Sequence, residues 1–236
     1  MTEHSITPVP TSFTTDGYAV VPAVLSDAQT AATREAADLL YRSSGRPRAG
    51  VREPVLHSPV LRGTAALPAV MRIARDVLGV KARVVRSILF DKTPDANWDV
   101  VWHQDVTIAV REKVETPGFG PWSSKAGVPS VQPPAAVLER MLTIRIHLDD
   151  CPADNGPLLV VPGSHNGGVM AIETLDTAAC DANAVACTLT AGSAVLMRPL
   201  LLHASRKSAA PAHRRVLHLD FAADPLPSPL RWYGEE

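Results

Sequence analysis

The feature that most constrains the fold is a series of short, β-rich segments that fills the chain from Lys81 onward. Six apolar segments are separated by Pro, Gly, Asn and Asp, and they lie at residues 82–90, 99–108, 142–150, 157–164, 193–203 and 214–222. Many short strands with turn residues between them are typical of an antiparallel sandwich or barrel, and not of a parallel βαβ sheet. We therefore expect a mainly β fold.

Two amphipathic helices are predicted ahead of this β-rich part. The first covers about residues 26–42 and begins with a capping-box pattern, in which Gln29 stands three residues after Ser26. The second covers about residues 67–78, where apolar residues repeat along one face and Gly79 provides a stop signal. We expect both helices to flank the β structure.

The length of 236 residues suits one large domain, and we expect a single domain over residues 1–236. One interval, residues 111–140, is rich in Pro and Gly. It is too irregular for a strand and too long for a hairpin turn, so we expect a lid or insertion loop.

Composition narrows the class of protein and its partners. The chain is 46% hydrophobic and 20% charged, and its net charge of -1 provides no general field for attracting nucleic acid or an anionic membrane. We see neither a leader-like N-terminus nor the roughly 18 uninterrupted apolar residues of a membrane span, so we expect a cytoplasmic protein. Cys151, Cys180 and Cys187 lack CxxC spacing and are expected to be packing residues.

Three motifs place a histidine and an aspartate two positions apart, at residues 103–105, 147–149 and 218–220. On a strand, such a pair points to one face, and two imidazoles with one carboxylate form the facial triad of non-haem Fe(II) oxygenases. Chance supplies this motif readily, so the motif alone selects none of the three. His203 follows the first two motifs and can complete either, whereas no histidine follows the third. Spacing therefore leaves two candidates.

Two arginines, Arg214 and Arg215, enter the last predicted strand after His203. A buried arginine presents a rigid fork that binds a carboxylate, such as the distal carboxylate of 2-oxoglutarate. On alternation, one arginine faces inward and the other outward, and the sequence alone does not say which.

The order of these motifs resembles the phytanoyl-CoA dioxygenase family of Fe(II)/2-oxoglutarate-dependent oxygenases. The segments "WHQD", "LDDCPADNGPLLVVPGSH" and "LLHASRKSAAPAHRRVLHLDF" carry the resemblance, together with the opening "FTTDGYAVVPAVLSDAQ". It covers about residues 13–222 and implies a double-stranded β-helix, which is a cupin-like jelly roll, with N-terminal helices outside it.

The resemblance also implies the site residues. His103, Asp105 and His203 match the iron ligands, because the family places this motif upstream of the long insertion. Arg214 matches the family's 2-oxoglutarate arginine and is thus preferred to its neighbour, and Ser205 matches a position that often hydrogen-bonds the same carboxylate. The motif at 147–149 matches positions that are not ligands in the family.

Other positions depart from the family or remain secondary to it. Arg145 stands where relatives often carry a tryptophan, and it is a candidate for binding 2-oxoglutarate or an anionic group of the substrate. Lys92 is expected at the surface, and His165 is expected to be a structural histidine. In the insertion, Phe119 and Trp122 are candidates for apolar contacts with the substrate.

The resemblance implies an oxygenase that uses Fe(II), 2-oxoglutarate and O2, oxidises a small-molecule metabolite and releases succinate and CO2. The intact Asp105 favours hydroxylation, desaturation or cyclisation over halogenation. Two alternatives stay open: a cupin-like metal-dependent isomerase or other non-oxidative enzyme, and a catalytically silent barrel that acts as a binding module. The sequence specifies neither the substrate nor the oligomeric state.

Overall fold

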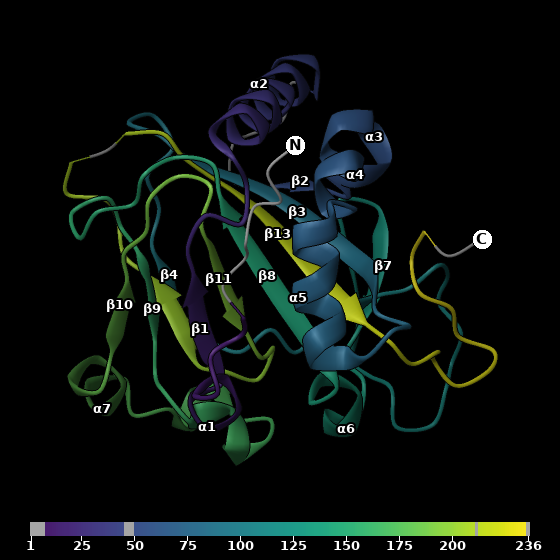
Figure 1. Ribbon diagram of the computed structural model, residues 1–236. Coiled ribbons are helices and arrows are strands. Elements are labelled where there is room, and N and C mark those ends of the chain that lie inside the picture. The colour runs from purple at the N-terminus through teal and green to yellow at the C-terminus, as the bar shows by residue number, and fades with distance from the viewer. Residues whose placement is uncertain (1–7, 45–49, 211, 235–236) are drawn as a thin grey trace.

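Three antiparallel sheets form the β-rich part of the chain (Figure 1), and the computed structural model describes residues 8–44, 50–210 and 212–234. The strands of the six-stranded sheet are, in spatial order, β1 (Tyr18–Val21), β11 (Ala194–Met197), β8 (Met141–His147), β13 (Arg214–Ala222), β3 (Arg83–Lys92) and β2 (Val51–Arg52). The strands of the four-stranded sheet are, in spatial order, β10 (Val185–Cys187), β9 (Leu158–Val160), β12 (His203–Ser205) and β4 (Val100–His103). The strands of a small third sheet are, in spatial order, β5 (Ile108–Ala109), β7 (Val128–Val131) and β6 (Trp122–Lys125). The prediction of a mainly β fold is confirmed.

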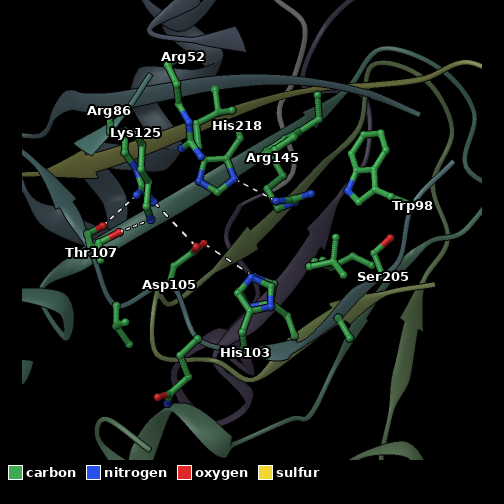
Figure 2. A pocket seen from close by; sticks show the side chains of 18 of the residues that line it. Arg52, Arg86, Trp98, His103, Asp105, Thr107, Lys125, Arg145, Ser205 and His218 are labelled. Carbon is green, nitrogen blue, oxygen red and sulfur yellow. Dashed lines mark hydrogen bonds and ion pairs between the residues drawn. The ribbon is translucent and has the colours of Figure 1, made fainter. Parts of the chain in front are cut away.

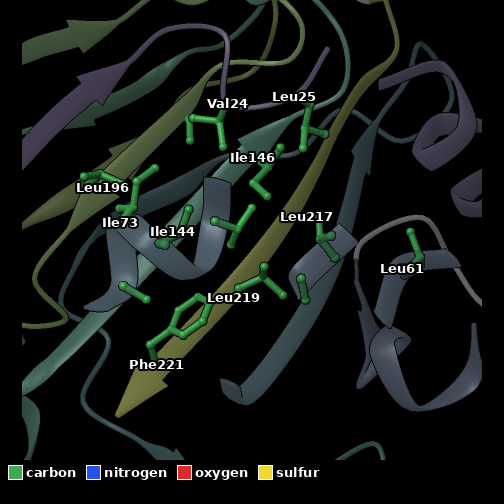
Figure 3. Packing of buried hydrophobic residues seen from close by; sticks show 14 of the residues in the cluster. Val24, Leu25, Leu61, Ile73, Ile144, Ile146, Leu196, Leu217, Leu219 and Phe221 are labelled. Atoms are coloured by element: carbon green, nitrogen blue, oxygen red, sulfur yellow. The ribbon is translucent and has the colours of Figure 1, made fainter. Parts of the chain in front are cut away.

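The central strands β8 and β13 separate an apolar core from a polar cavity. Every residue of both strands is buried, and their side chains alternate between the two faces of the sheet. One face is apolar and contributes Ile144, Ile146, Leu217, Leu219 and Phe221 to the main core (Figure 3). The opposite face is polar and carries Thr143, Arg145, His147, Arg214, His218 and Asp220. Burial of so many polar groups needs partners or a ligand, because an unpaired buried polar group is costly.

Helices cover the apolar face of the six-stranded sheet (Figure 1). Residues of α1 (Phe13–Asp16), α2 (Asp27–Ser44), α3 (Pro54–His57), α4 (Pro59–Ala65) and α5 (Pro68–Leu78) contribute to this core. Helices α6 (Ala135–Leu138) and α7 (Thr177–Ala182) pack into other apolar clusters, and short 3-10 helices lie at Ser164–Gly167 and Ile172–Thr174. From α5, Ile73 packs into the main core.

Both predicted helices are confirmed. At the start of α2, the Ser26 N–H donates to Gln29 Oε1 at 2.9 Å and the Gln29 N–H donates to Ser26 Oγ at 3.3 Å, which is the predicted capping box. Helix α5 ends at Gly79, whose φ of 88° lies in the left-handed region. The sequence did not predict α1, α3 or α4, because each is too short to show a helical period.

The structure corrects the prediction that residues 99–108 form one strand. Strand β4 ends at His103, and β5 begins only at Ile108. Between them, the Asp105 N–H donates to the Pro199 carbonyl at 2.9 Å instead of joining the sheet. This loop hydrogen bond, and not the alternation of side chains along a strand, therefore positions Asp105.

The insertion 111–140 is also more regular than we expected. It contains β6, β7 and α6, and β6 and β7 form a hairpin whose two turn residues, Ala126 and Gly127, have φ values of 54° and 84°. Two consecutive positive φ values are the mark of a tight hairpin turn that matches the twist of its strands. The predicted irregular loop is wrong over these residues.

Other features concern packing and the chain ends. All three cysteines are free and buried, as expected of packing residues. Across the described ranges, no helix combines the length and the apolar character needed to cross a bilayer. The expectation for the N-terminal segment rests in part on residues 1–7, which lie outside the described residues.

Candidate metal centre and active site

Three side chains that the sequence separates by up to 100 residues converge beside a cavity of about 290 Å³. His103 ends β4 and His203 begins β12, and the two are direct partners across the antiparallel pair. Their ring centroids are 4.1 Å apart. His203 Nε2 lies 3.7 Å from Asp105 Oδ2, and one ligand atom from each of the three residues falls within 4.8 Å of the others. Figure 2 shows His103 and Asp105 at the lower side of this cavity.

The backbone fixes the orientation of both imidazoles. Nδ1 of His103 lies 2.8 Å from the Val101 carbonyl, and Nδ1 of His203 lies 2.9 Å from the Leu201 carbonyl. A carbonyl only accepts, so Nδ1 carries the proton in each ring and Nε2 keeps a lone pair. This arrangement is the usual outer support of a metal-binding histidine.

The charges of the triad fit a divalent cation. Burial, followed by the neighbouring His103, lowers the pKa of His203 to about 3, so its imidazole is neutral at pH 7. Burial works against the charge of Asp105, but His203 and Arg86 outweigh it and keep the pKa of this carboxyl well below its ordinary value. Asp105 Oδ2 is buried without a hydrogen-bond partner. The neutral imidazole of His203 and the ionised carboxylate of Asp105, which has a free oxygen, suit a 2-His-1-carboxylate site.

The other two motifs lie elsewhere among the described residues. His147 is fully buried, and neither ring nitrogen has a hydrogen-bond partner, while Asp149 turns to the opposite face and pairs with Arg215. His218 and Asp220 bond to each other at 3.0 Å within a separate buried network. Only the first motif is brought together with His203 in the described part of the chain.

Two buried cations meet at Ser205, and Ser205 and Arg214 line the far end of the cavity. Arg214 Nη1 donates to Ser205 Oγ at 3.1 Å and also to the Gly156 carbonyl. Lys92 Nζ donates to the same Ser205 hydroxyl at 2.8 Å. Arg214 and Lys92 are direct cross-strand partners, which places two like charges opposite each other.

Neither cation of this pair has a carboxylate within ion-pair distance among the described residues. Arg214 Nε is buried without a hydrogen-bond partner. Burial, followed by the charge of Arg214, lowers the pKa of Lys92 to about 7. Lys92 is only 1% exposed, so the prediction of a surface lysine is wrong. Such a pair fits one carboxylate of an anion such as 2-oxoglutarate, because an anion offsets both the repulsion and the cost of burial.

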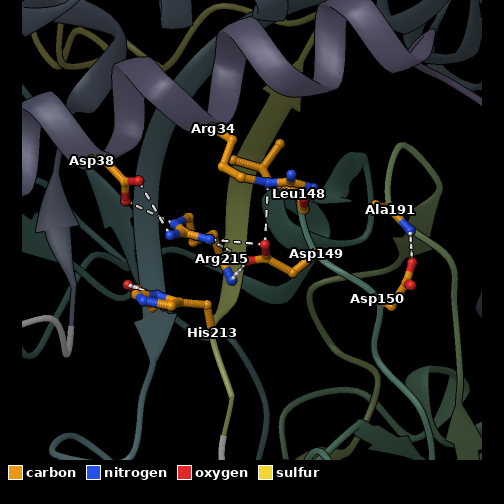
Figure 4. A network of polar contacts seen from close by, with 9 residues as sticks. Arg34, Asp38, Leu148, Asp149, Asp150, Ala191, His213 and Arg215 are labelled. Atoms are coloured by element: carbon orange, nitrogen blue, oxygen red, sulfur yellow. Dashed lines mark hydrogen bonds and ion pairs between the residues drawn. The ribbon is translucent and has the colours of Figure 1, made fainter.

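Arg215 points away from the cavity and joins helix α2 to the sheet (Figure 4). Its guanidinium bonds to Asp38 of α2 at 2.8 Å and to Asp149 at 2.8 Å. The alternation that the sequence left undecided is thus settled in favour of Arg214 as the inward residue.

Arg145 takes part in a buried chain of contacts along the cavity wall (Figure 2). Its Nη1 lies 2.9 Å from His218 Nδ1, and His218 Nε2 lies 3.0 Å from Asp220 Oδ1. Asp220 in turn forms an ion pair with Arg86. Because arginine only donates, His218 accepts at Nδ1 and carries its proton at Nε2, which it donates to Asp220. Arg145 Nε has no hydrogen-bond partner.

Several other residues serve the scaffold in the structure. The Gln104 amide donates to the carbonyls of Gly168 and Leu200 at 2.8 and 2.7 Å, which ties the loop after β4 to its surroundings. His165 packs against Gly17, at a distance that leaves no room for a side chain there. Phe119 and Trp122 pack into an apolar cluster and do not line this cavity, contrary to our expectation.

The sequence model of the phytanoyl-CoA dioxygenase family matches residues 13–216. The chain belongs to this family. The family predicted from the motif order is therefore confirmed.

The curated relatives include the ectoine dioxygenases of Bordetella parapertussis and Bordetella bronchiseptica. Each is 26% identical to this chain over 167 residues, which are 65% of this chain and 47% of the relative. The chain thus spans about half the length of the curated relatives that it matches.

Solved structures of other proteins share the fold. The apoform of EctD from S. alaskensis is 25% identical and has a TM-score of 0.71, covering 92% of this chain and 78% of its own. The non-heme alpha ketoglutarate dependent carbocyclase SnoK from nogalamycin biosynthesis is 21% identical, with a TM-score of 0.67 and coverage of 93% and 92%. HygX from Streptomyces hygroscopicus, solved with nickel and 2-oxoglutarate bound, is 16% identical, with a TM-score of 0.67 and coverage of 92% and 88%.

Proposed function

We propose that this protein is an Fe(II)- and 2-oxoglutarate-dependent oxygenase that hydroxylates, desaturates or cyclises a small-molecule metabolite. The observation that carries this proposal is the pairing of two sites within one cavity. The two imidazoles and the carboxylate of the triad stand beside it, and Arg214, a buried cation without a carboxylate partner among the described residues, lines it together with Ser205. Family membership supports the same reaction class.

One set of residues would bind the metal, and another would bind the co-substrate. His103, Asp105 and His203 would hold Fe(II), and Arg214 with Ser205 would bind the distal carboxylate of 2-oxoglutarate. When bound, iron and 2-oxoglutarate supply the oxidation of a C–H bond by O2, with release of succinate and CO2. The protein holds the ligands in a fixed tautomer and places the charges that the co-substrate needs.

Arg145 is the departure from the family pattern, and we propose that it also serves the co-substrate end. Its guanidinium is buried and oriented by His218, and its Nε is free to donate. Phe90 stacks against it at 5.7 Å, which limits where the guanidinium can move.

The sheet arrangement supports a double-stranded β-helix. Side chains of the six-stranded sheet, such as Arg214, and of the four-stranded sheet, such as His103, line the same cavity. The reactive end of such a jelly roll lies between its two sheets. For the substrate we propose a small metabolite, and ectoine is the first compound to test because of the curated relatives.

Anaerobic titration tests the proposal. Addition of Fe(II) and then 2-oxoglutarate should produce a weak visible charge-transfer band in the wild-type protein. His103→Ala should abolish the band, and His147→Ala should retain it, because only His103 belongs to the triad. Absence of the band in wild-type protein, or its persistence in His103→Ala, would contradict the proposal.

A matched pair of variants separates the oxygenase from its alternatives. Arg214→Met should weaken 2-oxoglutarate binding by about 10- to 100-fold, because a charge-assisted pair is lost. Arg215→Met should leave that affinity unchanged and cost about 1–3 kcal/mol of unfolding free energy, since it removes the partner of two partly exposed carboxylates. Turnover that is indifferent to Arg214→Met and independent of O2 would favour a non-oxidative metalloenzyme, and a protein that binds no iron would favour a silent binding module.

A further inference from the structure

The end of the cavity away from Ser205 holds a second group of cations. Arg52 comes from β2, Arg86 from β3 and Lys125 from β6 of the insertion hairpin, and all three line the cavity. Figure 2 shows them on one side of Asp105, with Ser205 on the other side. Three different strands, from two sheets, therefore direct positive charge to the same place.

Arg86 already has partners. It forms an ion pair with Asp220, donates to the Thr107 carbonyl at 2.8 Å and lies 4.0 Å from Asp105 Oδ1. Its guanidinium is thus held in place by the protein itself.

Arg52 and Lys125 differ from Arg86 because no carboxylate pairs with either of them in the described part of the chain. Among the described residues, Lys125 Nζ bonds only to the Thr107 hydroxyl, at 3.0 Å, and the Arg52 side chain has no hydrogen-bond partner. The nearest acidic neighbour in sequence, Glu53, accepts hydrogen bonds from Ser87 at 3.1 Å and so turns away. Two half-buried cations thus remain without an anion.

The charge balance of the whole cavity points in the same direction. Five of the lining side chains are cationic, whereas Asp105 is the one carboxylate among them. Burial, and then Arg86, lowers the pKa of Arg52, and burial followed by Arg86 and Arg52 lowers the pKa of Lys125. A metal ion would add two further positive charges and 2-oxoglutarate two negative ones, of which the distal carboxylate would lie at the opposite end, beside Arg214. An additional anion at this end offsets the remaining repulsion.

We propose that the substrate carries an anionic group, a carboxylate or a phosphomonoester, which Arg52 and Lys125 bind on the side of the metal triad opposite Ser205. This inference rests on the proposed function and adds the substrate class to it. Arg86 acts as a positioning residue, because it keeps Thr107 and Asp105 in place beside the bound anion. The apolar walls, Ile88, Phe90 and Val106, would contact the carbon skeleton.

The test uses the full chain loaded anaerobically with Fe(II) and saturating 2-oxoglutarate. Butyrate, butyl phosphate and uncharged butyramide are titrated separately, and perturbation of the visible band reports binding beside the metal. Butyrate or butyl phosphate should bind at least about tenfold more tightly than butyramide, since only the anions make charge-assisted hydrogen bonds. The better of the two anions identifies the group.

Variants locate the binding. Arg52→Gln and Lys125→Gln should each weaken anion binding by about tenfold and leave the affinity for 2-oxoglutarate unchanged. Lys125→Arg keeps the charge and should retain binding, and Arg75→Gln, on the exposed side of α5, serves as the neutral control. Circular dichroism of each variant confirms that the fold is kept.

Three results would overturn the inference: equal binding of butyrate and butyramide, no effect of either Gln variant, or anions that displace 2-oxoglutarate and so bind at Arg214 instead. These failures leave the visible band of the wild-type protein intact, so they remove the substrate class alone. Failure of the band to form removes the proposed function, and this inference with it.

Discussion

Neighbouring residues of β13 serve opposite sides of the sheet. Arg214 faces the cavity, and Arg215 binds Asp38 and Asp149 on the outside. Alternation predicts that the two differ, but choosing between them requires the position of α2, which supplies Asp38. Lys92 could not be predicted as a buried residue for a similar reason, because its burial depends on strands that pair across more than a hundred residues.

Glu53 offers a pH-dependent test at the residue scale. Burial raises the pKa of Glu53 to about 7, and hydrogen bonds from Ser87 only partly oppose this. The folded protein keeps the proton up to about pH 7, whereas the unfolded chain loses it near the ordinary value of 4.5. The unfolding free energy contributed by this group should therefore fall as pH rises from about 4.5 to 7 and stay level above that range.

Glu53→Gln should remove this decline, because an amide does not ionise. At pH 8 the variant should be more stable than wild-type protein by about 1–3 kcal/mol. Urea denaturation at pH 5, 6, 7 and 8 measures the difference. Glu139→Gln, at an exposed position, should follow the wild-type curve, and a Glu53→Gln curve parallel to wild type would contradict the assignment.

At the scale of elements, the long helices and the strands within apolar runs were predictable, whereas the shortest helices and the insertion hairpin were not. Helices α2 and α5 carry caps and a period that the sequence displays, and β13 was predicted over the residues that it occupies. The hairpin β6–β7 was missed because Ala126 takes a positive φ, which few residues other than glycine, asparagine and aspartate adopt. His103, Asp105 and His203, which the family resemblance implied as ligands, lie together in the structure, and their role as iron ligands stays a prediction.

The turn before β11 gives a prediction about how elements meet. Gly192 has φ +83°, and a Cβ there would stand 2.8 Å from the Leu25 carbonyl and 2.9 Å from the Thr30 hydroxyl. Gly192→Ala should cost about 1–3 kcal/mol of unfolding free energy, because it combines left-handed strain with a close contact to the start of α2. Gly63→Ala, in α4 with open space around it, should instead stabilise by about 0.5–1 kcal/mol. Denaturation curves that fail to separate the two would contradict this account.

At the scale of the whole molecule, one cavity is lined by polar side chains from all three sheets. Arg214 comes from the six-stranded sheet, His103 from the four-stranded sheet and Lys125 from the small one. In the absence of ligands, this arrangement works against folding, because like charges are buried near one another. Ligands that bind only the folded protein should recover that free energy.

Thermal unfolding measures this recovery. Mn(II) with 2-oxoglutarate, at about a hundredfold above their Kd, should stabilise the protein by about 3 kcal/mol and raise Tm by about 5–10 °C. A chelator should reverse the increase. His103→Ala should lose the increase in Tm, whereas Arg75→Gln should retain it. A wild-type Tm that does not change when both ligands are added would contradict the presence of a metal site here.

The insertion hairpin has a consequence for engineering. Lys125 is the last residue of β6, an edge strand of the small sheet, whereas the histidines of the triad lie on β4 and β12. An exchange of residues 111–140 for a hairpin of different charge would therefore alter which molecules are accepted without touching the ligands of the metal. Of the two cations proposed to bind the substrate, Lys125 thus lies on a piece of chain separate from the proposed metal ligands, and a library confined to this segment would test how far this one cation sets the choice of substrate.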